Sequence, residues 1–205
     1  MCTVALAADG QPRKAFRSAD QALARSIELR RSDLPAGFTA GPGSSGEGEV
    51  PRCKGFKPDE SDLTLVGRAS SPDFDKSGNP PLISSAVDVW LTTAQARADF
   101  QRVVRPGLDA CLSSVIGKAL TASAPKGVRY LPVSHTLKSL SGLGQQAATV
   151  RLVFTGVSGG SRIPFVVDYY AIRKHRVTAL VTTVDLRASY AAGPKLAATV
   201  ASRIP

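Results

Sequence analysis

The sequence has few of the side chains that enzymes and metal proteins most often use. Its 205 residues include only two histidines and three cysteines, with no C-x-x-C pair and no cysteine–histidine spacing typical of a metal site. His135 and His175 stand far apart, and neither has a cluster of carboxylates beside it. No Gly-rich phosphate loop leads into a helix. We therefore predict no metal site, no cofactor and a non-enzymatic protein.

Long apolar runs and acidic residues are also scarce. No run approaches the roughly 20 apolar residues that a transmembrane helix needs, so none is predicted. Hydrophobic residues still make up 43% of the chain, which is enough for one domain with a core and excludes wholesale disorder. Residues 1–109 carry equal numbers of basic and acidic side chains, so the whole net charge of +10 lies in residues 110–205. Aromatic residues do not interleave with these basic residues, and no nucleic-acid-binding motif is present, so we predict no nucleic-acid partner.

The first residues resemble the end of an export signal. Ala5-Leu6-Ala7 follows the small-x-small pattern of a signal-peptidase site, and a polar stretch begins at Asp9. We interpret residues 1–16 as the remnant of a signal peptide and a flexible N-terminus, and residues 17–205 as a single domain. The protein is then extracytoplasmic, either secreted or held at the cell envelope as a lipoprotein through Cys2. The alternative is an ordinary Ala-rich chain end.

Two cysteines are expected to form a disulfide bond if the protein is exported. Cys53 follows a Gly/Ser/Glu/Pro-rich loop, and Cys111 lies on the apolar stripe of a predicted helix. A Cys53–Cys111 bridge would stabilise the fold by about 4 kcal/mol through the long loop that it closes. The alternative is two separate thiols, with Cys111 packed as a small hydrophobic residue.

Hydrophobic periodicity predicts four helices and six main strands. The helices cover residues 17–31 and 92–104, a segment that starts near 108, and a final segment opened by Pro194. The strands cover 63–68, 83–91, 127–137, 146–156, 163–173 and 176–185. Short turns between the last four strands indicate an antiparallel meander, so the predicted fold is α+β, with helices packed mainly on one face of the sheet.

The last hairpins define the predicted register of the meander. With turns at Ser158-Gly159 and Lys174-His175, one face collects apolar residues and forms the core: Val150, Leu152, Phe154, Phe165, Val167, Tyr169, Leu180 and Val184. The other face is half polar and brings Arg151 near Asp168. Arg151, Asp168 and Tyr170 are therefore candidates to line a small ligand cleft. The alternative is a cross-strand ion pair that only satisfies its own two charges.

Basic residues are expected at both ends of this sheet. Lys138, Arg173, Lys174 and Arg176 gather at one end, and Lys126, Arg129, Arg162 and Arg187 near the other. Such clusters can contact anionic lipid headgroups or acidic wall polymers. The alternative is solvated surface charge that keeps the domain soluble.

One segment follows the G-x-S-x-G pattern of serine hydrolases, with Ser158 at its centre and Asp168 and His175 after it in hydrolase order. That motif requires a strand running into a helix, whereas strands are predicted on both sides of Ser158. His175 is expected at the opposite end of a strand about 35 Å long. A hydrolase using Ser158 is therefore the least favoured interpretation.

Several short segments together resemble a known group of proteins. They are Asp33-Leu34-Pro35-Ala36-Gly37-Phe38, Val87-Asp88-Val89-Trp90, Asp109-Ala110-Cys111-Leu112 and residues 170–176. In this pattern the chain resembles actinobacterial secreted proteins and lipoproteins of unknown function, and it is similar to the extracellular sensor domain of PknH-type kinases and to PsbP-like lipoproteins. Those sensor domains carry more cysteines, and such proteins often have glycine where this chain has Lys174-His175.

The resemblance implies a single domain with an antiparallel sheet packed by helices, a disulfide bond, and non-enzymatic binding outside the membrane. We accordingly predict an exported ligand-binding or sensor-like domain whose ligand is an unknown small molecule or envelope component. The alternative is an envelope-associated protein that holds anionic lipid or wall polymer through its basic sheet ends.

Overall fold

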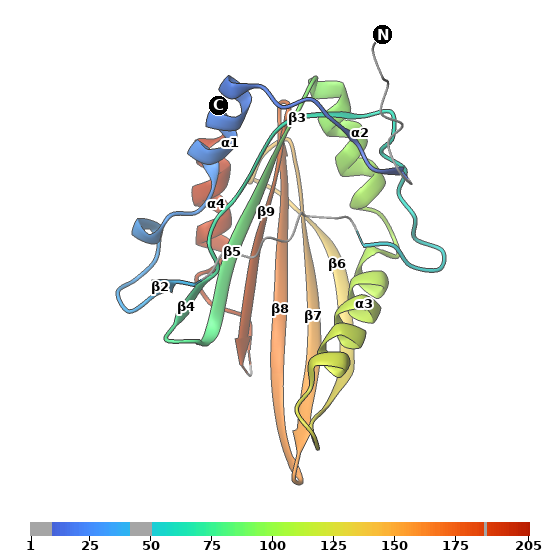
Figure 1. The fold of residues 1–205 in the computed structure, drawn as a ribbon, viewed down its shortest axis with the longest axis vertical. Coiled ribbons are helices and arrows are strands. Elements are labelled where there is room, and N and C mark those ends of the chain that lie inside the picture. Colours follow the sequence, from blue (N-terminus) through green and yellow to red (C-terminus); the bar gives the residue numbers. More distant parts are fainter. Residues whose placement is uncertain (1–9, 42–50, 187) are drawn as a thin grey trace.

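One large sheet organises the computed structural model, which describes residues 10–41, 51–186 and 188–205 (Figure 1). The described strands are β1 (Arg13–Lys14), β2 (Thr39–Ala40), β3 (Thr64–Ser70), β4 (Phe74–Lys76), β5 (Asn79–Trp90), β6 (Arg129–Leu140), β7 (Gln146–Ser158), β8 (Ser161–Lys174) and β9 (Val177–Leu186). The described helices are α1 (Ser18–Ile27), α2 (Thr93–Val103), α3 (Leu108–Ser123) and α4 (Gly193–Arg203), and a short 3-10 turn, η2, covers Arg31–Asp33.

The order of the main strands is β1-β3-β5-β9-β8-β7-β6. Strands β6 to β9 form the predicted antiparallel meander, and β5 and β3 extend it, also antiparallel. Strand β1 pairs with β3 in parallel, which makes the sheet mixed, while β2 and β4 form a small flap beside β5. The structure therefore confirms a single α+β domain whose sheet is mostly antiparallel.

The helices begin where the sequence supplies suitable residues. The Thr92 hydroxyl accepts a hydrogen bond from the Gln95 backbone N–H at 3.2 Å and so caps α2. Helix α3 starts after Gly107, whose φ of +95° is costly for residues with a side chain. Pro194 stands in the first turn of α4, where its missing N–H has no helical partner to lose.

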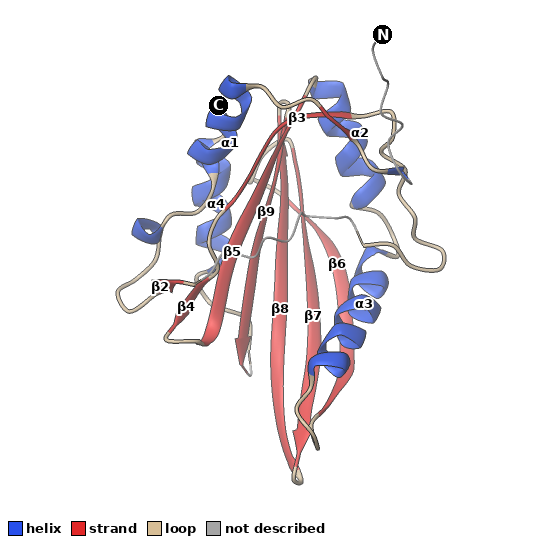
Figure 2. Ribbon diagram, viewed as in Figure 1, coloured by secondary structure: helices blue, strands red, loops and turns tan. Residues whose placement is uncertain are grey.

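Helices cover both faces of the sheet, which corrects the prediction that they pack mainly on one face (Figure 2). Thr149 pairs with Tyr170 and Val150 with Tyr169, so these two pairs lie on opposite faces. Tyr170 belongs to a core that includes residues of α1 and α4, whereas Val150 packs with residues of α3. The second layer forms because the central strands carry apolar side chains on both faces, and each face must be buried.

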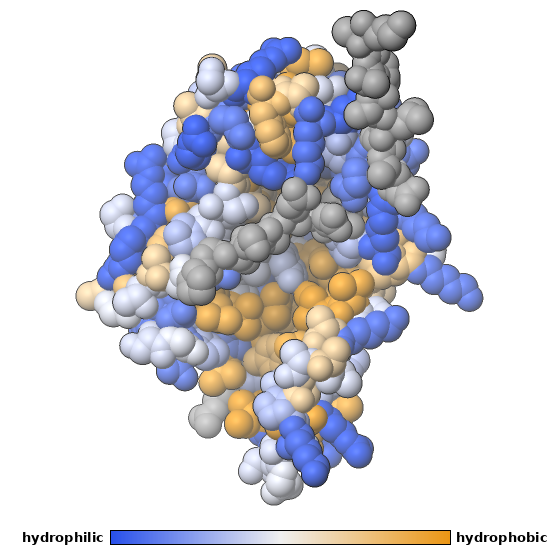
Figure 3. Space-filling view, viewed as in Figure 1, coloured by the Kyte–Doolittle hydropathy of each residue, from blue (hydrophilic) through white to orange (hydrophobic). Residues whose placement is uncertain are grey.

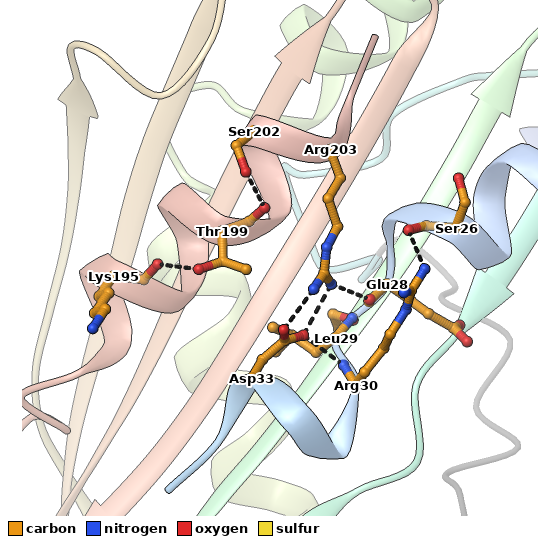
Figure 4. A network of polar contacts seen from close by, with 10 residues as sticks. Ser26, Glu28, Leu29, Arg30, Asp33, Lys195, Thr199, Ser202 and Arg203 are labelled. Carbon is orange, nitrogen blue, oxygen red and sulfur yellow. Dashed lines mark hydrogen bonds and ion pairs between the residues drawn. The ribbon is translucent and has the colours of Figure 1, made fainter.

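Arg203 of α4 connects that helix to η2 and to the residue that follows α1 (Figure 4). Both Arg203 Nη atoms donate to the Asp33 carboxylate, at 2.5 and 2.9 Å, and one of them also donates to the Glu28 carbonyl at 2.8 Å. Asp33 in turn accepts from the Arg30 backbone N–H. These bonds connect η2 to the C-terminal end of α4 and lower the pKa of Asp33 against the opposing effect of its burial.

The segment just before residue 17, where the domain is predicted to begin, contacts the sheet. Arg13 and Lys14 form β1 and pair with Thr64 and Leu65 of β3, so this segment is part of the sheet. The expected signal remnant in residues 1–9, including Cys2, lies outside the described residues. Among the residues that the structure describes, no helix is long and apolar enough to cross a membrane.

Candidate functional site

Arg151 and Asp168 pair across β7 and β8 at the register expected from the sequence. Arg151 Nε donates to Asp168 Oδ1 at 2.7 Å. The Asp168 side chain is about fully buried, at 1% exposure, whereas that of Arg151 is 50% exposed. Hydrogen bonding to the carboxylate raises the pKa of Arg151. This geometry is that of an ion pair in which the arginine neutralises a buried aspartate.

Tyr170 does not form an open cleft with this pair. It lies in the core, 5% exposed, beneath α4. A Cβ atom added at Gly193 would stand 2.8 Å from the Tyr170 hydroxyl oxygen, so the helix and the ring are in close contact. Burial raises the pKa of Tyr170, with a further contribution from Asp168. Asp168 and Tyr170 are therefore buried in this structure, and of the three candidate ligand-facing residues only Arg151 reaches solvent.

Three of the four predicted anion-contact residues are engaged within the fold. Arg173 is buried and donates to Gln146 Oε1 at 2.6 Å. Lys174 Nζ donates to the Ile204 carbonyl at the end of α4, and Arg176 contacts Asp20 of α1 at 2.5 Å. Lys138 alone of the four is exposed on the edge strand β6. At this end of the sheet, Lys174 and Arg176 therefore bond to the segments of α4 and α1, and Arg173 bonds to β7.

Cys53 and Cys111 form the disulfide bond that the sequence predicts. Their Cα atoms are 5.6 Å apart, within the usual range for a disulfide. Cys111 is buried near the start of α3, among Phe56, Val150 and Leu152. The bond therefore fastens the segment before β3 to the helix that packs on β6 and β7.

The hydrolase motif forms a hairpin. Ser158 ends β7 and pairs with Ser161 at the start of β8, with Gly159 and Gly160 between them at positive φ. His175 lies in the next turn, beyond the other end of β8. No group of three or more histidine, cysteine, aspartate or glutamate residues suited to a metal ion occurs within the described ranges.

A buried acidic cluster beneath α2 went unrecognised in the sequence. Glu60 and Asp99 are 4% and 8% exposed and share a hydrogen bond. Burial, with the nearby Asp88 charge, raises the pKa of Glu60 to about 7, and burial together with Glu60 raises that of Asp99 well above its ordinary value. Asp99 also bonds to Thr178 of β9. The pair therefore retains a proton to higher pH than isolated carboxylic acids do.

A small cavity of about 140 Å³ lies next to this cluster, between α2 and the sheet. Its polar wall includes Arg68 and Asp88, which form a two-pronged ion pair at 2.6 and 2.8 Å. The rest of the wall is mostly apolar and includes Phe100 and Val103 of α2. The cavity is small, and Arg68 and Asp88 in its wall are already paired with each other, so we do not interpret it as a ligand site. The adjacent carboxyl groups of Glu60 and Asp99 are the groups with raised pKa values.

A larger hollow of about 460 Å³ lies on the same face of the sheet, at the end that carries the β7–β8 hairpin. We call it the apolar groove. Its walls come from α3, the segment after α3, and strands β5 to β9: Pro80, Leu82, Leu120, Val128, Tyr130, Gly156, Ser158, Ser161, Ile163, Phe165, Val184 and Leu186. Figure 3 shows hydrophobic surface in this region between α3 and the lower strands.

The groove exists because the helices on this face leave one end of the sheet uncovered. Helix α3 packs on β6 and β7, which leaves the neighbouring ends of β8, β9 and β5 without a helix at this level. Strand β8, with 14 residues, extends roughly 46 Å, whereas the 16 residues of α3 extend about 24 Å. Apolar side chains at the uncovered strand ends, among them Ile163 (48% exposed) and Leu186 (47%), therefore meet solvent.

Comparisons of this chain with protein-family models, with curated proteins and with solved structures found no match. The resemblance to PknH-type sensor domains and PsbP-like lipoproteins therefore stays a prediction.

Proposed function

We propose that this protein is a non-enzymatic binding domain of the cell envelope, outside the cytoplasm, and that its apolar groove holds the hydrocarbon part of an amphiphilic ligand. The observation that carries the proposal is the groove itself. Its volume lies in the range of small-molecule sites, and its lining is predominantly apolar, with a few hydroxyl groups at the hairpin. Exposed apolar side chains gathered in one hollow are unusual for a soluble domain unless they bind something.

The charge at this end of the sheet favours an anionic headgroup. Lys126, Arg129 and Arg162 are exposed at the hairpin end that also carries the groove, with Arg129 and Arg162 on the opposite face of the sheet. A ligand with a hydrocarbon chain and a negatively charged head would match both features. The disulfide bond is compatible with the extracytoplasmic location in this proposal, because such bonds persist in oxidising compartments.

The test is saturable binding of a fluorescent long-chain fatty acid, cis-parinaric acid. Ile163→Asp places a carboxylate against the hydrocarbon chain and is expected to weaken binding at least about tenfold, because an unpaired charge would be desolvated. Val133→Asp is the matched control, since Val133 is 61% exposed and lies outside the groove. Leu186→Asp provides a second groove variant if Ile163→Asp lowers the melting temperature. Absence of saturable binding to the unaltered protein, or equal loss in variant and control, refutes the proposal.

A further inference from the structure

A second exposed apolar surface lies on the edge strand β6, at the hairpin end of the sheet, where Leu131 faces away from the groove and Val133 stands at a bulge between Pro132 and Ser134. Leu131 and Val133 of β6 are 47% and 61% exposed. Leu131 pairs with Thr155, which lies on the same face of β7 as Arg151, whereas the groove residue Gly156 faces the other way. Helices α1 and α4 pack on β3, β5, β8 and β9, so this corner of β6 and β7 lies beyond them.

Cations surround these apolar residues. Arg129 pairs with Val157, and Val157 pairs with Arg162, so the two arginines stand on one face on either side of a valine. Lys126 lies in the turn between Pro125 and Val128, directly before β6. All three cationic side chains are exposed, and within the described part of the chain none of them forms an ion pair.

Little negative charge offsets these three cations. Residues 110–205 contain only two acidic side chains, Asp168 and Asp185. Asp168 is buried against Arg151, and Asp185 lies on β9, where it pairs with Val166, four positions along β8 from Arg162. Of the acidic side chains in residues 110–205, only Asp185 is therefore left to offset these three cations.

We propose that this corner, made up of Lys126, Arg129, Leu131, Val133 and Arg162, docks the protein on an anionic lipid bilayer. Leu131 and Val133 would enter the interfacial region while the three cations contact lipid headgroups, a combination that gives reversible membrane binding. A second copy of the chain fits poorly, because a two-fold contact would bring the same cations together. The inference deepens the proposed function, on which it partly rests, since the bilayer would be the source of the ligand for the groove on the other face of the same hairpin.

The experiment is sedimentation with vesicles of phosphatidylcholine, with and without about 30% phosphatidylglycerol. Binding is expected only to the anionic vesicles and should weaken steeply between about 50 and 500 mM salt. Arg129→Gln/Arg162→Gln should weaken binding about 25-fold, from about fivefold for each charge removed. Arg25→Gln/Lys195→Gln is the matched control, with the same loss of charge at exposed positions of α1 and α4, and should bind as the unaltered protein does.

The outcomes separate this inference from the proposed function. Val133→Asp should reduce vesicle binding and leave uptake of the fatty acid probe unchanged. Ile163→Asp should reduce uptake of the probe more than it reduces vesicle binding. Equal binding to neutral and anionic vesicles, no binding to either, or equal effects of the two glutamine pairs overturns the docking surface. Vesicle binding without probe uptake contradicts the groove alone.

Discussion

The stability of the protein should fall as pH rises from about 5 to 7 because of Glu60. In the folded protein the pKa of Glu60 is raised to about 7 from 4.5, so the native state binds a proton more tightly than the unfolded chain does. The stabilisation is fully present below pH 4.5 and is lost as pH rises through 7. Glu60→Gln replaces the carboxyl group with a neutral group of similar shape and removes this titration.

The magnitude follows from the size of the shift. At 1.36 kcal/mol per pKa unit, the difference between 4.5 and about 7 corresponds to roughly 3 kcal/mol at neutral pH. Glu60 is 4% exposed, so little solvent screening reduces this figure. Burial still raises the pKa of Asp99 in Glu60→Gln, although the contribution from the Glu60 charge is lost, so Asp99 keeps part of the pH dependence. Glu60→Gln should therefore make the slope of unfolding free energy between pH 5 and 7 shallower, by up to about 1.4 kcal/mol per pH unit.

The assay is urea denaturation at pH values from 5 to 8, followed by circular dichroism. Asp73→Asn serves as the control, since it makes the same chemical change in a part-exposed residue outside the cluster. The unaltered protein and the control should show the same falling curve, and Glu60→Gln should be flatter and more stable at pH 7.5. A slope unchanged by Glu60→Gln would refute the assignment of the buried proton to this cluster.

Two further predictions concern stability. Replacing Cys53 and Cys111 by serine removes the bond that closes a loop of 58 residues and should lower the unfolding free energy by about 4 kcal/mol relative to the oxidised protein. Urea denaturation measures this loss, and the unaltered protein in reducing buffer should lose the same amount. Arg151→Ala should cost about 3 kcal/mol by the same assay, because it leaves the buried Asp168 charge unpaired, whereas Asp168→Asn should cost less because the half-exposed arginine regains water. Equal costs for the two changes would contradict the ion-pair assignment.

The meander was predictable because neighbouring strands follow one another directly along the chain and are joined by short turns. Alternating apolar residues and short turns place β6 to β9, and counting outward from the two hairpins puts Arg151 opposite Asp168. The conformation of the His175 turn is not set by local sequence alone: His175 adopts a φ of +51° although it is not glycine, and its backbone N–H donates to Gln145, 30 residues away. The Cys53–Cys111 pairing was predicted only on the condition that the protein is exported, because the position of Cys111 on an apolar stripe also fits a free buried thiol.

The arrangement of the helices depends on contacts between distant segments, which periodicity does not specify. Nothing local indicates that β5 pairs with β9, or that β1 adds a parallel strand beside β3. Tyr170 was read as half-polar surface because its strand neighbours include charged residues, yet α4 closes over it.

The apolar groove and the acidic cluster depend on contacts between segments that are distant in sequence, so no local sequence motif predicts them. The apolar groove forms where α3 fails to cover the sheet, so it depends on the relative widths of two layers and not on any motif. The acidic cluster did leave a trace, since Asp99 occupies the same helical stripe as the buried residues Ala96 and Phe100. An acidic residue within an apolar stripe indicates a buried carboxylate, although its partner Glu60 is far away in sequence.

Nuclear magnetic resonance of methyl-labelled protein during titration with a long-chain fatty acid tests the central claim most directly. Saturable shifts are expected for the groove methyl groups of Leu120, Ile163 and Leu186, while those of Leu196 and Val200, on the buried side of α4, stay unchanged. Saturable shifts at the α4 methyl groups with none in the groove, or no saturable shifts at all, would contradict it.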